Sequence, residues 1–89
     1  MNPKFSLGQI VATPNALHNL TPEDIQRGIQ QHQSGNWGEV RDSDRQENDL
    51  SLEKGFRLLS VYRAACGKLF WIITEANRSA TTVLMPEDY

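Results

Sequence analysis

Residues 57–86 read Arg57-Leu-Leu-Ser-Val-Tyr-Arg-Ala-Ala-Cys-Gly-Lys-Leu-Phe-Trp-Ile-Ile-Thr-Glu-Ala-Asn-Arg-Ser-Ala-Thr-Thr-Val-Leu-Met-Pro86, and this stretch decides the fold. It concentrates β-branched and aromatic residues, which are enriched in strands. Two turn signals divide it, Cys66-Gly67 and Asn77-Arg78, because glycine and asparagine tolerate the backbone angles of tight turns. The stretch therefore predicts a three-stranded antiparallel meander.

Two-residue turns at both places would put Val61 opposite Ile72, and Val83 on the other side of Ile72. Alternate side chains then separate onto two faces of the sheet. One face is expected to carry Leu59, Val61, Phe70, Ile72, Val83 and Met85, and the other Leu58, Tyr62, Leu69, Trp71, Ile73 and Leu84. Both faces are apolar, whereas a sheet with one solvated face would alternate apolar and polar residues. A chain this short therefore needs either helices on both faces or a partner on one, and we expect helices on one face and a partner on the other. A register shift of one residue would mix the two sets.

The length and the net charge of the chain limit the classes of protein to which it can belong. Its 89 residues predict one small domain, 1–89, and a core of this size gives marginal stability, to which a partner or a second copy would add. The formal net charge of −2 is not typical of a protein that coats nucleic acid, which usually shows a basic patch or stripe. Nucleic acid is therefore a less favoured partner than protein.

Cysteine and hydropathy patterns exclude further classes. One cysteine, Cys66, cannot make an intramolecular disulfide framework, and with two histidines it leaves too few ligands for a usual zinc site. No metal or cofactor is therefore expected. No apolar run approaches the roughly 20 residues that span a bilayer, and the N-terminus has no apolar stretch of signal-peptide length. The sequence predicts a cytoplasmic protein without a membrane partner.

The chain before the meander is more polar and more helical. Residues 5–13 alternate and then become apolar before a proline stops them, so they are expected to form a strand that could join the edge of the meander. A short helical turn is expected over residues 14–20. A stronger helix should run from Thr21 to Gln33, because Thr21 can cap it and a proline takes its first position. The predicted fold class is α+β.

An acidic segment, residues 42–54, predicts a third helix capped by Asp42 or Ser43 and closed by a glycine. Four acidic residues in this segment invite a metal hypothesis: Asp44, Glu47, Asp49 and Glu53. Their spacing matches no calcium-binding loop, which needs a glycine and a terminal bidentate glutamate. The pattern favours a solvated acidic helix.

Two residues before the acidic segment carry alternative interpretations. His32 ends an apolar stripe that Ile25 and Ile29 begin at helical spacing, which favours a partly buried, hydrogen-bonded histidine over a catalytic one. Trp37 lies in a loop between two glycines. It is interpreted as a core anchor, with an exposed binding hot spot as the alternative.

Enzyme motifs are missing from the sequence. It has no Gly-x-x-x-x-Gly-Lys-Ser/Thr phosphate loop, no Gly-x-Gly-x-x-Gly, no Gly-x-Ser-x-Gly elbow and no His-Glu-x-x-His. The chain is therefore predicted not to be an enzyme. A small hydrolase or nuclease centred on His32 with Asp44 and Asp49 stays open as the weakest hypothesis.

A set of motifs runs through nearly the whole chain from about Leu7. These motifs are His32-x-x-Gly-x-Trp-Gly38, Asp44, Asn48-Asp49, Arg57-Leu-Leu-Ser-x-Tyr62, Trp71-Ile-Ile-Thr-Glu-Ala-x-Arg-Ser-x-Thr-Thr82 and Pro86-Glu-Asp-Tyr89. With them the chain resembles a small bacterial family labelled "plasmid-related protein" or, misleadingly, "type I restriction endonuclease subunit M". The block that begins at Trp71 is the specific part. The sequence departs from the family pattern at Cys66, where a turn aspartate is usual.

The resemblance implies where the protein acts, and it does not imply a reaction or a ligand. Members of this family occur on plasmids and integrated mobile elements, which implies a bacterial cytosol and cargo genes that often deal with host defence. The methyltransferase label does not fit, because a cofactor-binding methyltransferase domain needs a doubly wound parallel sheet with a glycine-rich first turn. An 89-residue chain with one meander cannot supply that sheet.

The first hypothesis is therefore a non-enzymatic accessory protein of a plasmid or other mobile element. It would act by binding another protein, a host defence or DNA-processing complex, or a second copy of itself. Its candidate binding residues are Trp37, Tyr62, Trp71, Ile73 and Leu84. The alternative is a small nucleic-acid-binding module that uses stacking and cations, with Arg57, Arg63, Lys68 and Arg78 as its candidate residues.

Overall fold

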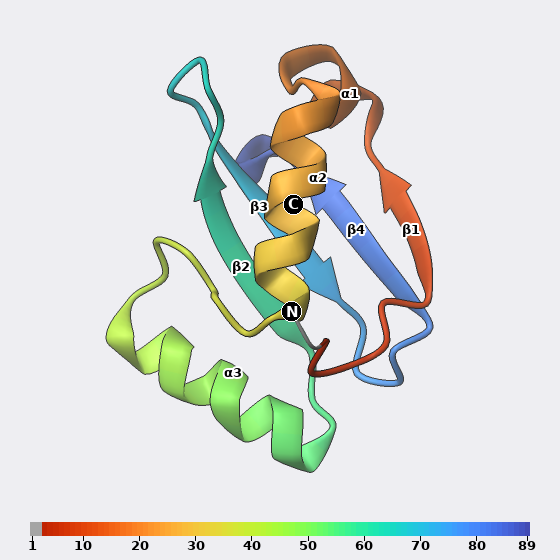
Figure 1. Cartoon of the computed structure of the whole chain (residues 1–89), viewed down its shortest axis with the longest axis vertical. Coiled ribbons are helices and arrows are strands. Elements are labelled where there is room, and N and C mark those ends of the chain that lie inside the picture. Colours follow the sequence, from red (N-terminus) through yellow and green to blue (C-terminus); the bar gives the residue numbers. More distant parts are fainter. Residues whose placement is uncertain (1–2) are drawn as a thin grey trace.

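The computed structural model describes residues 3–89, so the first two residues of the predicted domain 1–89 lie outside the described part. In chain order the elements are β1 (Gln9–Ala12), α1 (Pro14–Asn19), α2 (Pro22–Gln33), α3 (Asp42–Lys54), β2 (Leu58–Arg63), β3 (Leu69–Thr74), β4 (Ala80–Leu84) and the 3-10 helix η1 (Pro86–Asp88). Figure 1 shows an open sheet with α2 lying across its front and α3 below. The predicted α+β class is confirmed.

The four strands of residues 3–89 have the order β1-β4-β3-β2. Strands β2, β3 and β4 form the predicted antiparallel meander, and β1 joins its edge by pairing in parallel with β4. The N-terminal strand is shorter than the predicted 5–13. It is limited by Gly8, whose φ of 63° is left-handed, and by Pro14, where α1 begins.

The first hairpin corrects the predicted register. Val61 pairs with Trp71 and not with Ile72, because the loop contains three residues, 65–67, and not two. The residues that flank this loop are joined by a main-chain hydrogen bond of 2.8 Å. Gly67 has a φ of 94°, and a left-handed glycine at the end of a three-residue loop is a common way to close a hairpin.

The second hairpin has the predicted register, with Ile72 opposite Val83. The prediction therefore places the side chains of β2, and of no other strand, on the wrong faces of the sheet. The face under α2 carries Leu58, Ser60, Tyr62, Phe70, Ile72, Thr74, Thr81 and Val83, and the other face carries Leu59, Val61, Leu69, Trp71, Ile73, Thr82 and Leu84. The prediction puts Tyr62 and Trp71 on the same face, whereas the structure places them on opposite faces.

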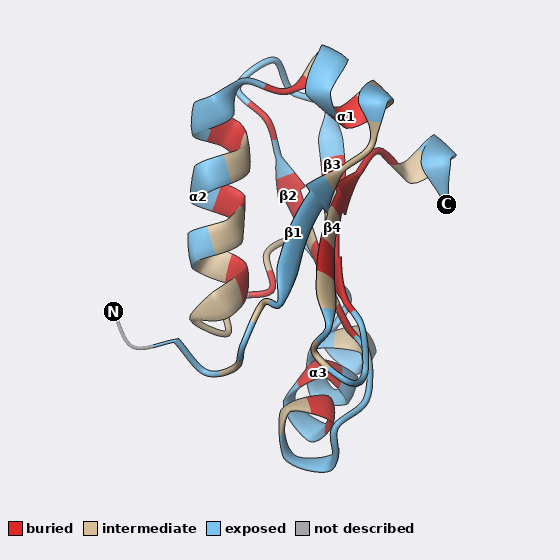
Figure 2. Cartoon of the chain, turned by 90° about the vertical axis from the view of Figure 1, so that its right-hand side faces the viewer, coloured by how far each residue is buried: buried red, intermediate tan, exposed pale blue. Residues whose placement is uncertain are grey.

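Helix α2 begins with a complete capping box. The Thr21 hydroxyl accepts from the N–H of Asp24 at 3.1 Å, and the Asp24 carboxylate accepts from the N–H of Thr21 at 3.1 Å. The helix comes close to the sheet at Gly28, where a Cβ would lie 2.9 Å from a ring carbon of Phe70. Figure 2 shows the buried residues of α2 facing the sheet. Together α1 and α2 cover one face, as predicted.

Helix α3 departs from the prediction that all helices cover one face. It lies beside the edge strand β2, at the lower end of the sheet (Figures 1 and 2). Its N-cap is the preceding residue, which makes no side-chain cap, so the predicted cap by Asp42 or Ser43 is wrong, whereas Gly55 closes the helix as predicted. Within residues 3–89 the second face has no α-helix over it, and Tyr89 packs there against Trp71 with ring centroids 5.5 Å apart.

Candidate protein-binding site

The outer edge of β2 is closed by a side chain and a loop. Asn48 of α3 donates its amide N–H to the carbonyl of Leu59 at 2.6 Å and accepts from the N–H of Leu59 at 3.1 Å. Val61 donates its N–H to the carbonyl of Trp37 at 3.0 Å and accepts from the N–H of Glu39 at 2.7 Å. These outward backbone groups are therefore paired, which protects the edge from other strands.

We expect Asn48→Ala to lower the free energy of unfolding by about 1–3 kcal/mol, because it leaves a strand N–H and C=O without their partner. Urea unfolding followed by circular dichroism measures the change. The matched control is Gln46→Ala on the exposed side of the same helix, which should change stability by less than about 0.5 kcal/mol. Equal effects of the two substitutions would contradict the edge-closing role of Asn48.

The opposite edge, β1, has no such closure within residues 3–89. Strand β1 is terminal in the sheet order. Gln9 and Thr13 each donate their N–H inward, to the carbonyls of Ser79 and Val83, both at 3.0 Å. Backbone groups alternate in direction along a strand, so the N–H and C=O groups of the residues between them, positions 10 and 12, point to the open side. The β1 edge can therefore accept a further strand.

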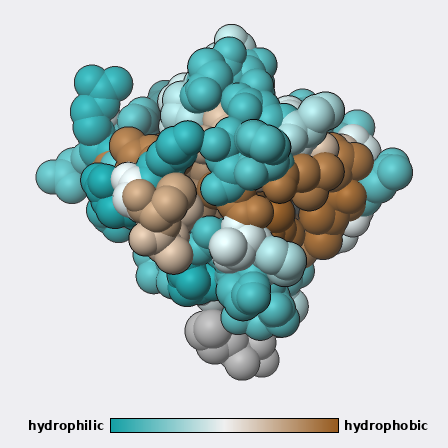
Figure 3. Space-filling view, turned by 90° about the horizontal axis from the view of Figure 1, so that it is seen from above, coloured by the Kyte–Doolittle hydropathy of each residue, from teal (hydrophilic) through white to brown (hydrophobic). Residues whose placement is uncertain are grey.

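Apolar side chains are exposed along this open edge. Ile10 is 50 % exposed, Val11 40 % and Leu17 62 %. In the view from above, an apolar patch lies on the side where Figure 1 places β1 (Figure 3). The four residues of β1 include neither the lysine nor the proline by which native edge strands avoid pairing. An uncharged, partly apolar edge of this kind indicates a binding surface.

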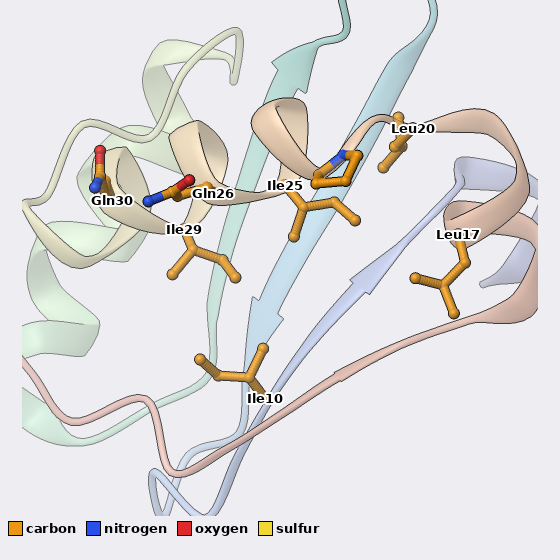
Figure 4. A pocket seen from close by; sticks show the side chains of 8 residues that line it. Ile10, Leu17, Leu20, Ile25, Gln26, Ile29 and Gln30 are labelled. Atoms are coloured by element: carbon orange, nitrogen blue, oxygen red, sulfur yellow. The ribbon is translucent and has the colours of Figure 1, made fainter.

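An apolar groove of about 530 Å³ runs between the open edge and helix α2. We call it the β1–α2 groove. Ile10 enters it from β1, Leu17 from α1, and Ile25 and Ile29 from α2, and Figure 4 shows these side chains directed into a common space. The amides of residues 26 and 30 are its polar lining groups, and none of its lining residues is charged. The groove can hold apolar side chains from a strand added to β1.

His32 forms a buried polar network away from the groove. Its Nδ1 lies 2.6 Å from the Ser60 hydroxyl and its Nε2 lies 2.8 Å from the Thr74 hydroxyl, which is 2.8 Å from that of Thr81. Burial, assisted by the charge of Arg78, lowers the pKa of His32 from 6.5 to about 3. The ring is therefore neutral, and both of its nitrogens are engaged. This geometry is the hydrogen-bonded histidine that the apolar stripe favours.

The predicted binding residues are divided between two places. Trp37 is 1 % exposed and Tyr62 6 % exposed, and Tyr62 packs under α2 because of the register of the first hairpin. Trp71, Ile73 and Leu84 do share the other face of the sheet. Only Trp71 among them is partly exposed, since Ile73 and Leu84 are each 5 % exposed. The five residues therefore do not form one exposed surface.

The four predicted nucleic-acid-binding cations lie towards the two ends of strand β2. Arg63 follows its last apolar residue and pairs with Glu39 at 3.0 Å, and Lys68 in the adjoining loop donates to α1. Arg57 precedes the strand and contacts the C-terminal tyrosine. Arg78 donates to main-chain carbonyls of α3 and of its own turn. The arrangement differs from a continuous basic stripe.

The hydrolase or nuclease hypothesis combines His32 with Asp44 and Asp49, but both carboxylates lie against other groups. Asp49 accepts from the indole N–H of Trp37 at 3.1 Å, and Asp44 lies 3.7 Å from Arg41. Across residues 3–89 no group of three or more His, Cys, Asp or Glu side chains lies close enough to hold a metal ion.

In the same range, no helix combines the length and the apolar character needed to cross a membrane.

The chain matches no protein-family model, no curated protein and no solved structure. The β1–α2 groove is absent from the predicted sites, although its residues were visible in the sequence as the apolar positions of three separate segments. Sequence patterns assigned Ile25 and Ile29 to a core-facing stripe and gave no reason to join them to Ile10 and Leu17.

Proposed function

We propose that this chain is a non-enzymatic accessory protein that acts by binding another protein through strand addition at β1. One observation carries the proposal: Ile10, whose backbone groups point to the open side of β1, also lines the β1–α2 groove. In this mode of recognition, main-chain hydrogen bonds supply affinity, and pockets for alternate side chains supply specificity.

An extended segment of another polypeptide fits this site better than a second copy. The uncovered apolar surface at the edge comes from Ile10, Val11 and Leu17, whereas a stable protein–protein interface takes about 20–30 residues from each side. A short segment needs only the strand hydrogen bonds and one or two anchoring side chains. A homodimer is the competing occupant, and the solution mass distinguishes it from a monomer that binds a segment.

The resemblance to plasmid-related proteins supports a setting for this activity. In that setting the chain serves a plasmid or other mobile element, and its partner belongs to a host defence or DNA-processing complex. The nucleic-acid alternative draws less support, because Arg63 and Arg57 lie at opposite ends of β2 and each contacts a side chain of the same protein. Protein binding is therefore the better supported of the two functions.

Leu17→Glu is expected to weaken the binding of an added segment about 10–100-fold, because it removes an apolar contact and places a charge in the groove. Binding segments are first selected from a random-peptide display library and then measured by fluorescence anisotropy. The matched control is Leu50→Glu, a substitution of a similarly exposed leucine on α3, outside the groove. Equal losses in both variants would contradict the groove as the binding site.

A second pair of variants separates the contribution of main-chain hydrogen bonds at β1 from that of the Ile10 side chain in the groove. Ile10→Pro removes an outward N–H, while Ile10→Ala keeps that N–H and removes the side chain. Proline is tolerated on edge strands where the N–H faces solvent, so the fold should persist. Strand addition predicts weaker binding by Ile10→Pro than by Ile10→Ala. Equal binding by the two variants would exclude the main-chain contribution.

The accessory role is tested in cells. Bacteria with active restriction or CRISPR interference should take up more unmodified plasmid when they express this chain than when they express Leu17→Glu. The count of transformants measures the difference. The same count for both proteins, across hosts with each kind of defence, would contradict a host-defence target.

A further inference from the structure

Resting on the strand addition proposed above, we infer that the β1–α2 groove selects an uncharged extended segment that carries apolar side chains at two alternate positions. The selection follows from the strand geometry of β1, from the small side chain of Ala12 and from the absence of charged side chains among the lining residues of the groove.

The alternate spacing comes from the face on which β1 presents its residues. Ile10 lines the groove, and Ala12 packs against the core cluster on the same side of the sheet. Side chains of directly opposed residues on neighbouring strands lie on the same face, so the two partner residues opposite Ile10 and Ala12 project over the groove. The partner residue between them lies beside Val11, on the other face.

The two positions differ in size. Ile10 fills part of the groove from its own side, and it is 50 % exposed. Ala12 has only a methyl group, and the apolar side chain of Leu17 stands at that end of the groove. The partner residue opposite Ala12 therefore has more room, and we assign the larger apolar side chain to it.

Charge is excluded by the chemistry of the lining. Gln26 and Gln30 are its polar side chains, and the remaining lining residues are apolar. A carboxylate or ammonium group in the groove would lose water without gaining an opposite charge, which disfavours binding. The two amides can both donate and accept hydrogen bonds, so they accommodate an uncharged segment.

The test uses three synthetic ten-residue peptides that share a Gly/Ser frame. The first has Thr-Val-Thr-Leu-Thr at its centre, and the other two replace the leucine by glutamate or by lysine. We expect the uncharged peptide to bind at least about tenfold more tightly than either charged one in fluorescence anisotropy. Equal or tighter binding by a charged peptide would overturn the inference.

A reciprocal substitution sharpens the test. Gln26→Lys should improve binding of the glutamate peptide about tenfold relative to the uncharged one, because it supplies the missing opposite charge. The matched control is Gln31→Lys, which adds the same charge to the same helix outside the β1–α2 groove and should leave the ranking unchanged. An unchanged ranking in Gln26→Lys would show that the missing opposite charge is not what excludes the glutamate peptide.

The failure of this inference can be told from that of the proposed function. If display-selected segments carry charges and yet lose binding in Leu17→Glu, the selection rule is wrong and strand addition stands. If no segment binds, or if light scattering shows a dimer that Ile10→Pro dissociates, the partner is not an extended segment and both are overturned.

Discussion

Replacing Trp37 by alanine should lower the free energy of unfolding by about 3–5 kcal/mol, the cost of removing a large aromatic side chain from a core. Trp37 is 1 % exposed and packs against Phe5 and His32, with ring centroids 6.2 Å and 5.6 Å away. Its indole N–H also donates a hydrogen bond of 3.1 Å to the carboxylate of Asp49 on α3. Domains of this kind have total stabilities of about 5–15 kcal/mol, so the loss is a large fraction of the whole.

Urea unfolding measures this effect, and Trp71→Ala is the matched control. Trp71 is only partly buried and packs against the exposed Tyr89, so its loss should cost less than half as much. A loss at Trp37 no greater than that at Trp71 would contradict the core-anchor role.

Lowering the pH should destabilise the protein from about pH 6.5 downward, because the unfolded chain then binds a proton at His32 that the folded chain does not. Burial, followed by the charge of Arg78, depresses the pKa of His32 to about 3 in the folded state. The stability that neutral His32 contributes is thus complete above pH 6.5 and is lost as the pH falls towards 3. The full difference is about 4–5 kcal/mol, with a slope of about 1.4 kcal/mol per pH unit within the window.

The measurement is the free energy of unfolding in urea at intervals between pH 4.5 and 7. Asp24 does not interfere in this range: burial opposes its charge, but hydrogen bonds, mainly from the N–H groups of Thr21 and Ala65, hold its pKa at about 2. His32→Gln should reduce the slope, whereas His18→Gln, at an exposed position, should preserve it. An unchanged slope in His32→Gln would show that another group causes the dependence.

The sequence predicted those parts of the fold that local patterns determine. Thr21 and Pro22 marked the start of α2, and the apolar run before the second turn gave the pairing of Ile72 with Val83. The first hairpin was mispredicted because Cys66-Gly67 suits both a two-residue and a three-residue loop, and one residue of slip reverses every side chain of β2.

Tertiary features lay beyond local patterns. The closure of the β2 edge by Asn48 joins segments 11 residues apart through one amide, which no helical pattern signals. The groove joins Ile10 to Leu17 and α2, and its existence depends on which edge of the meander β1 takes. A strand could be expected at that edge, but its open side could not.

Amide hydrogen exchange by NMR measures whether β1 accepts an added strand. The free protein should exchange the outward N–H groups of Ile10 and Ala12 rapidly, and a bound display-selected segment should slow both at least about tenfold. Leu59 and Val61 on the closed β2 edge should be protected in both states. Slow exchange at Ile10 and Ala12 in the free monomer, or no change there when the segment binds, would show that β1 does not accept an added strand.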